Sequence, residues 1–192
     1  ASLDWQLQSP TSTSYCSGYY LPYQPQLLDQ PLTSGEQPLY SNADSSEHEK
    51  GITYLTGNVE LRQGDQKITG DSAKFDSNDS SVDISGHVEF RRPHMIVQSN
   101  DASFNMTNSG AQLNQAQLAL PNNELRATAA SVDYHSDNTV TMNDGSFTFC
   151  PPGDNAWAIH SNKIDLDPSS GFGEAQNAIL KIGVVPVFYL PW

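Results

Sequence analysis

The sequence has little positive charge. It contains nine Lys and Arg residues against 22 Asp and Glu residues, which gives a formal net charge of −13. Phosphate backbones attract Lys and Arg, so this balance argues against nucleic-acid binding. The same shortage argues against a polybasic membrane anchor.

Long apolar runs are missing as well. No stretch reaches the roughly 18 residues that a membrane-spanning helix needs, and the first residues lack the basic-then-apolar pattern of a signal peptide. Hydrophobic residues make up 36% of the 192 residues and charged residues only 16%. Uncharged polar residues fill the difference, which is typical of exposed antiparallel β structure rather than of a helical bundle.

Cysteine is scarce, with only Cys16 and Cys150 in the chain. Two distant cysteines without a C-x-x-C motif or a nearby His cluster do not make a metal site. Two interpretations stay open: unrelated buried thiols, or disulfide chemistry in an oxidising compartment. Cys150 precedes Pro151 and Pro152, which hold its backbone extended and suit a fixed attachment point.

Catalytic and metal-binding motifs are absent too. There is no G-x-S-x-G, no phosphate-binding glycine loop and no H-E-x-x-H. Residues 76–80 begin like a calcium loop, but Ser81 and His87 stand where that loop needs Gly and Glu. Asp165 and Asp167 fit a strand end and its turn. We therefore expect no enzyme, cofactor or metal; a glycan-cleaving enzyme with paired carboxylates is a remote alternative.

What is present falls into two parts. Residues 1–39 carry Cys16, several prolines and a tyrosine cluster, without a helical or strand period. They are expected to form an extended, partly disordered arm that docks once it finds a partner.

The remainder repeats. Gly57-Asn58-Val59-Glu60 returns 29 residues later as Gly86-His87-Val88-Glu89, and residues 68–75 return at 97–104. Weaker copies lie at 125–132 and 157–164. A period of about 28–30 residues indicates a repeat architecture.

Each repeat reads as short strands, in which apolar and polar residues alternate between Gly, Asn and Asp turns. This pattern predicts an all-β sandwich, jelly roll or stacked sheet. Residues 110–131 could suit a helix, but the alternation of Ala116, Leu118 and Leu120 favours a strand. Exposed edge strands at the two ends of such a stack could pair with a similar module.

Alternation also predicts which side chains point inward. Two sheets facing each other would enclose a long apolar slot, which is either a filled core or, if open at its ends, a lipid groove. The inward set includes Val59, Leu61, Ile68, Phe75, Ile84, Val88, Phe90, Phe104, Leu118, Leu120, Val132, Phe147, Ile164 and Ile179.

Three segments carry a family resemblance. The C-terminal stretch GVVPVFYLPW, residues 183–192, resembles a segment of the LptD lipopolysaccharide-assembly family, also called Imp or OstA. Residues 177–181 and 145–153 resemble two further segments of that family in the same order. The repeat is similar to the OstA-like repeat that LptD shares with LptA and LptC.

The resemblance implies a fold and a role. It implies a twisted, V-shaped β-jellyroll of stacked antiparallel strands over residues 40–182, with residues 183–192 leading into a β-barrel that is absent from this chain. Such a domain lies on the periplasmic side of an outer-membrane protein. It would receive lipopolysaccharide from LptA by edge-strand pairing and pass the lipid A acyl chains through its slot for insertion into the outer membrane. The inward set above then becomes the candidate lipid-binding set.

The resemblance also concerns partners and cysteines. It implies that the full-length protein works with its own barrel and with LptE, and that two cysteines of this domain bond to a Cys pair in the barrel. Cys150 matches the second of them by motif, and Cys16 matches the first by order only. In this chain the two could pair with each other, or Cys16 could stay free.

Two further expectations concern the ligand. The acidic composition predicts that an anionic glycolipid is held by its tails, with its head group near water. The alternatives are a free-standing LptA-like bridge and a structural β-repeat domain that binds no ligand.

Overall fold

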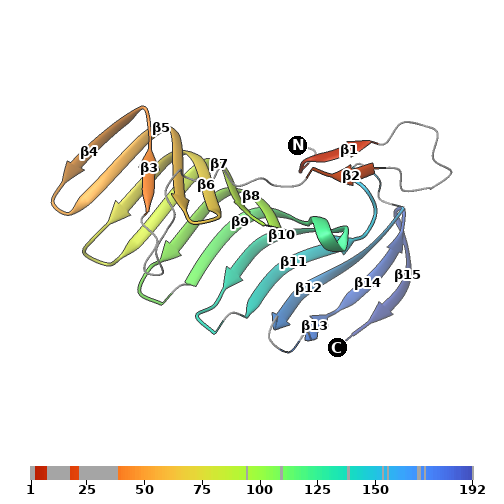
Figure 1. Ribbon diagram of the computed structural model, residues 1–192. Helices are drawn as coiled ribbons and strands as arrows, with labels where there is room; N and C mark the ends of the chain where they lie inside the picture. Colours follow the sequence, from red (N-terminus) through yellow and green to blue (C-terminus); the bar gives the residue numbers. More distant parts are fainter. Residues whose placement is uncertain are drawn as a thin grey trace.

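The computed structural model is one long, twisted antiparallel sheet with a small N-terminal ribbon beside it (Figure 1). It describes residues 3–7, 18–21, 39–93, 95–108, 110–137, 139–152, 154, 156–167, 170 and 172–191. The all-β prediction is confirmed, and residues 110–120 form a strand as expected. Among the described residues no helix is long and apolar enough to cross a bilayer.

The main sheet has 13 strands, and almost all are joined to their neighbours in chain order. Only one short 3-10 helix, η1 (Pro121–Asn123), interrupts the described part. The strands are β3 (Tyr40–Asn42), β4 (Ser45–Glu49), β5 (Ile52–Gln63), β6 (Gln66–Asp76), β7 (Ser81–Arg92), β8 (Met95–Asn105), β9 (Gly110–Leu120), β10 (Leu125–Tyr134), β11 (Val140–Thr148), β12 (Trp157–Asp167), β13 (Phe172–Gln176), β14 (Ala178–Ile182) and β15 (Val185–Leu190).

A crease runs across the sheet where the strands bend. At the crease, alternate strands contain a residue with positive φ, and the pairing register shifts between β5, β6, β7 and β8. These residues are spaced 29, 28, 29 and 33 positions apart: Asn58, His87, Gln115, Asp144 and Asn177. The period seen in the sequence is therefore the period of the bend.

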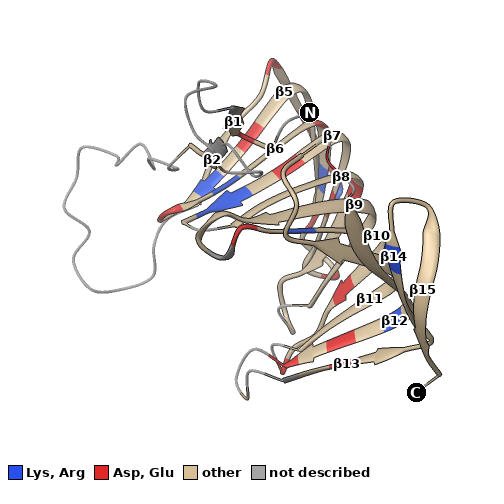
Figure 2. Ribbon diagram, turned by 90° about the vertical axis from the view of Figure 1, so that its right-hand side faces the viewer, with Lys and Arg blue, Asp and Glu red and all other residues tan. Residues whose placement is uncertain are grey.

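The crease divides the sheet into two leaves. Leaf A comprises β3, residues 59–63, 66–70, 88–92, 95–99, 116–120, 125–129, 145–148 and 157–161, and β14 with β15. Leaf B comprises residues 45–49, 52–56, 72–76, 81–85, 101–105, 110–114, 131–134, 140–143, 163–167 and 172–176. The leaves give the fold its V shape (Figure 2). The sequence suggested two facing sheets. Instead there is one sheet, and its long strands bend at the crease, so that one part of each strand belongs to leaf A and the other part to leaf B.

Small residues line the inner side of the crease, where the leaves are closest. An added Cβ at Gly70 would lie 2.6 Å from Cγ2 of Ile84, so this side chain packs directly on the Gly70 backbone. The small residues of this row are all buried: Gly70, Ser99, Ala116, Ala129, Gly145, Ser161 and Ala178.

Replacing Gly86 by alanine should destabilise the fold. Gly86 has φ +75°, and an added Cβ would lie 2.3 Å from an oxygen of Asp71. Left-handed strain plus this clash should lower the free energy of unfolding by about 2–3 kcal/mol in urea titration. Gly183→Ala is the control, because Gly183 has φ +57° and no atom within 4 Å of the added Cβ. Equal losses in the two variants would show that the crease contact contributes nothing.

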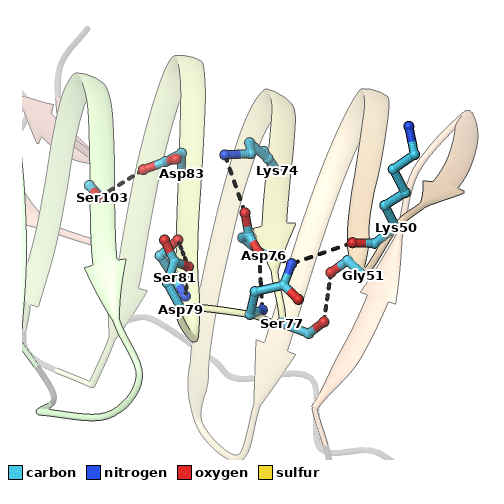
Figure 3. A network of polar contacts seen from close by, with 10 residues as sticks. Lys50, Gly51, Lys74, Asp76, Ser77, Asp79, Ser81, Asp83 and Ser103 are labelled. Atoms are coloured by element: carbon cyan, nitrogen blue, oxygen red, sulfur yellow. Dashed lines mark hydrogen bonds and ion pairs between the residues drawn. The ribbon is translucent and has the colours of Figure 1, made fainter.

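The turns at the free edge of leaf B interlock (Figure 3). The Ser77 hydroxyl donates a hydrogen bond to the Gly51 carbonyl at 2.6 Å, which joins the β6–β7 turn to the β4–β5 turn. Asp76 accepts hydrogen bonds from the backbone N–H of Asn78 at 3.0 Å and from its side chain at 2.9 Å. The Asn78 hydrogen bonds, with a lesser effect from Lys74, hold the pKa of Asp76 below its usual value.

The N-terminal ribbon packs on the outer face of leaf A. It consists of β1 (Trp5–Leu7) and β2 (Gly18–Tyr20), in the region expected to be an extended, partly disordered arm. Leu3 is buried with Ile96 and Ala119 of the sheet, and Tyr20 packs against them. The Asp4 carboxylate accepts hydrogen bonds from both terminal nitrogens of Arg91.

Candidate functional site

The inner face of the bent sheet carries apolar residues along most of its length. Strand alternation from the buried core residues places 13 of the 14 predicted slot residues on this face. Ile179 is the exception: it follows buried Ala178 and pairs with His160, which puts it on the outer face.

The inner-face residues form two classes by burial. Val59, Leu61, Ile84, Val88 and Ile164 are buried near the crease and fill the core. A second group is only half-buried, although most of its members lie in the same cross-strand rows as Leu61, Ile84 and Ile164, so the opposite leaf does not cover it completely. This group is Ile68, Phe75, Phe90, Phe104, Leu118, Leu120, Val132 and Phe147. Sequence alternation could find the face but not this division.

Both leaves contribute to the core. The larger cluster joins Leu61 and Val88 of leaf A to Val82, Ile84 and Leu113 of leaf B. A smaller cluster near the C-terminal end centres on Ala127, Ala129, Met142 and Ile164. The core therefore holds the leaves together at the crease, and apolar surface remains exposed beyond it.

Apolar exposure increases towards the C-terminal end. β15 pairs with β14 and extends leaf A by one strand, whereas leaf B ends at β13. The exposed fractions of the large apolar residues here run from 40% at Leu190 to 90% at Val184. An apolar surface thus continues from the inner face to this end of the sheet.

The outer face of leaf B is polar, and several of its acidic groups accept hydrogen bonds from neighbouring strands. Asp83 accepts a hydrogen bond from the Ser103 hydroxyl at 2.8 Å (Figure 3), and Asp165 accepts one from Thr141 at 2.7 Å. Hydrogen bonds from Lys163 and Thr141 lower the pKa of Asp165. This outer wall is suited to water, whereas the inner face is suited to hydrocarbon.

Asp165 and Asp167 behave as the sequence suggested. Both occupy the C-terminal half of β12 and, by alternation, both lie on the outer face. The described residues hold no group of three or more His, Cys, Asp or Glu side chains arranged to bind a metal ion. Both carboxylates thus lie on the outer face of leaf B, away from the inner face.

Cys150 is buried and is 5% exposed. Its thiol lies 3.9 Å from the Trp157 carbonyl, and its own carbonyl accepts a hydrogen bond from Nε of Arg126 at 3.1 Å. Cys16 lies outside the described residues, so its pairing stays a prediction.

The sheet has a polar edge at its N-terminal end. β4 pairs only with β5 in the described part, and all five of its residues are exposed. β3 forms the corresponding edge of leaf A and pairs with Glu60, Leu61 and Arg62. Both edges offer backbone groups to an added strand.

Known proteins resemble this chain in sequence. A family described as "LptA/(LptD N-terminal domain) LPS transport protein" matches residues 39–172. The LPS-assembly protein LptD of Pseudomonas aeruginosa (strain UCBPP-PA14) is 39% identical over 181 residues, which cover 93% of this chain and 20% of the relative. LptD of Pseudomonas putida (strain GB-1) is 32% identical over 181 residues, covering 93% and 19%. The chain thus spans about a fifth of these relatives.

A solved structure also matches. It is LptH from Pseudomonas aeruginosa, described as the LptA-homologous periplasmic component of the lipopolysaccharide transport device. It is 16% identical, covers 73% of this chain and 82% of its own, and has a TM-score of 0.28.

Proposed function

The chain belongs to the LptA/LptD N-terminal domain family of lipopolysaccharide-transport proteins, and on that premise we propose that its inner face carries the acyl chains of lipopolysaccharide. The observation that carries this proposal is the set of half-buried apolar side chains on the inner face of both leaves, which the opposite leaf does not cover completely. Burying hydrocarbon against them is favourable by about 25 cal/mol per Å² of apolar surface. No covalent step is required for this kind of transport.

The direction in which lipopolysaccharide passes follows the increase in exposed apolar surface from β3 and β4 towards β15. Lipopolysaccharide enters at the polar edge formed by β3 and β4, where a strand of an LptA-type partner extends the sheet. It leaves towards β14 and β15, where apolar surface is most exposed. In the longer protein this end leads towards the outer membrane, with the domain on the periplasmic side. The barrel and LptE belong to that longer assembly.

Photocrosslinking tests the lipid path. Probes that replace Phe104 or Leu118 should capture lipopolysaccharide, because both positions are half-buried on the inner face. Probes at Asp76 or Glu89 are the matched controls, since both belong to the outer face and should give at most background capture. Equal capture by the two sets, measured by immunoblot for lipopolysaccharide, would contradict the proposal.

The entry edge needs its own test. A photoprobe at His48 on β4 should capture an LptA-type partner, whereas one at Glu174 on β13 should not, because β13 lies at the opposite end of leaf B. Capture at Glu174 alone would reverse the proposed direction of passage. Capture at neither position would remove β4 as the docking edge.

A further inference from the structure

Among the described strand residues, Arg92 carries the one permanent charge on the inner face. Alternation along β7 places Arg92 on the same side as Val88, which is buried in the core, and Phe90, which is half-buried. It is the last residue of β7 and pairs with Met95 across the β7–β8 turn, so it stands at the free edge of leaf A. The side chain is exposed. Among the strand residues that the structure describes, no other Lys, Arg, Asp or Glu falls on the inner face.

Its neighbour Arg91 serves a different purpose. Arg91 points to the outer face, where Glu89 and Asp4 hold it. Arg92 makes no ion pair or hydrogen bond with any residue in the described part of the chain. Among the described residues its guanidinium thus has no partner, and it can contact a ligand that lies on the inner face.

The two leaves differ strongly in charge. Leaf A and its turns contain similar numbers of basic and acidic residues: Arg62, Lys67, Arg91, Arg92, Arg126 and Lys181 against Glu60, Asp65, Glu89, Glu124 and Asp154. Leaf B and its turns are strongly acidic: Lys50, Lys74 and Lys163 stand against Glu47, Glu49, Asp76, Asp79, Asp83, Asp101, Asp133, Asp137, Asp165, Asp167 and Glu174. Figure 2 shows these groups by colour. The net charge of −13 thus resides mainly on one leaf.

This division sets where an anionic head group can lie. If acyl chains occupy the inner face, the head group lies at the open side of the V, between the free edges of the leaves. The carboxylates of leaf B repel phosphate there, whereas leaf A offers Arg92. A guanidinium presents a planar set of donors that matches a phosphate in a bidentate fashion.

We propose that Arg92 anchors the phosphate of a phosphorylated lipid head group at the free edge of leaf A, while the acyl chains lie on the inner face. The proposal rests on the proposed function, because it needs the tails in that position. It differs from the expectation that the acidic chain holds its ligand by the tails alone. The ligand class is an amphiphile with both hydrocarbon chains and a phosphate near their attachment point.

The test compares two lipids and three forms of the protein. Binding of bisphosphorylated lipid A and of the same lipid with both phosphates removed is measured for the unmodified chain, for Arg92→Gln and for Arg92→Lys. Arg92→Gln should weaken binding of the phosphorylated lipid about five- to tenfold and leave the dephosphorylated lipid unchanged. Arg92→Lys should restore part of the loss, because it keeps the charge but not the planar geometry.

The matched control is Lys181→Gln. Lys181 lies on leaf A near its free edge but on the outer face, so its loss should leave binding of both lipids unchanged. Equal losses for Lys181→Gln and Arg92→Gln would show a general charge effect and overturn the proposal. Excess inorganic phosphate should compete only weakly, because it lacks tails. Complete competition would make Arg92 a free-anion site and would also overturn it.

Failure of the premise is distinguishable from failure of the proposal. If the unmodified chain binds neither lipid, the proposed function itself is wrong. If it binds both lipids and Arg92→Gln weakens neither or weakens both equally, the acyl-chain path stands and the phosphate anchor is wrong.

Discussion

The Ile84→Ala variant is expected to lose about 2–4 kcal/mol of unfolding free energy. Ile84 is 2% exposed, belongs to the cluster that joins the leaves, and packs on the bare backbone of Gly70 at the crease. Gly70 has no side chain that could move into the space it leaves. Urea titration followed by circular dichroism measures the loss.

Phe104→Ala is the informative comparison for this prediction. Phe104 packs against the same cluster but is only half-buried, so its removal should cost less stability than that of Ile84. It should weaken lipopolysaccharide binding more than Ile84→Ala does at a temperature where both variants are folded. The opposite result would be a folded Ile84→Ala variant that does not bind lipopolysaccharide and a Phe104→Ala variant that binds it normally. It would mean that the leaves separate as far as the crease and that the ligand reaches Ile84.

Alternation predicted the inner face well because it needs only the two-residue period of a strand. It placed Phe75, Phe104 and Leu118 correctly without knowledge of the bend. Ile179 was misplaced because Asn177 has a φ of 54°, which resets the phase of alternation just before it. Burial depth could not be predicted either, since it depends on how closely the opposite leaf approaches.

The crease was visible in the sequence but was interpreted as a break between strands. Gly57-Asn58 resembles a hairpin turn, because both residues adopt positive φ readily. The chain does not reverse its direction at Gly57-Asn58 because β5 pairs with the same neighbour, β6, both before and after the bend. Only long-range partners decide between a turn and a bend within one strand.

The ribbon was missed for a related reason. Its strands are three residues long and carry no period, so tertiary contacts alone define them. Leu3 is buried against Ile96 and Ala119, and Asp4 meets Arg91, which is 87 positions away. Local propensity contains no information about such contacts.

The Arg91→Met variant should lose about 2–3 kcal/mol of unfolding free energy at neutral pH, and the loss should shrink in acid. Arg91 holds the half-buried carboxylates of Asp4 and Glu89, and removing it leaves both charges without their cation. Burial on its own would raise the pKa of Glu89, but hydrogen bonds from Arg91 and Gln98 outweigh burial and lower it. Without Arg91, burial should raise that pKa above its ordinary value.

The pH dependence then has opposite signs in the two proteins. In the unmodified chain the lowered pKa of Glu89 adds stability above its unfolded value of 4.5, and this contribution is lost as the pH falls through the folded pKa. In Arg91→Met the raised pKa makes protonation of Glu89 favour the folded state, so the variant should gain relative stability as the pH falls towards that value. Urea titrations at neutral and acidic pH measure the gap between the two proteins.

Arg62→Met separates the ribbon from the strand contact. Arg62 pairs with Glu60 at 2.5 Å one repeat earlier, in the same arrangement as Arg91 with Glu89 but without the contact to Asp4. Its substitution should therefore cost less than that of Arg91, and the difference reports what Asp4 and the ribbon contribute. Equal costs for the two variants would mean that Asp4 adds no stability, and the ribbon would then be held on leaf A by the burial of Leu3 and Tyr20 alone.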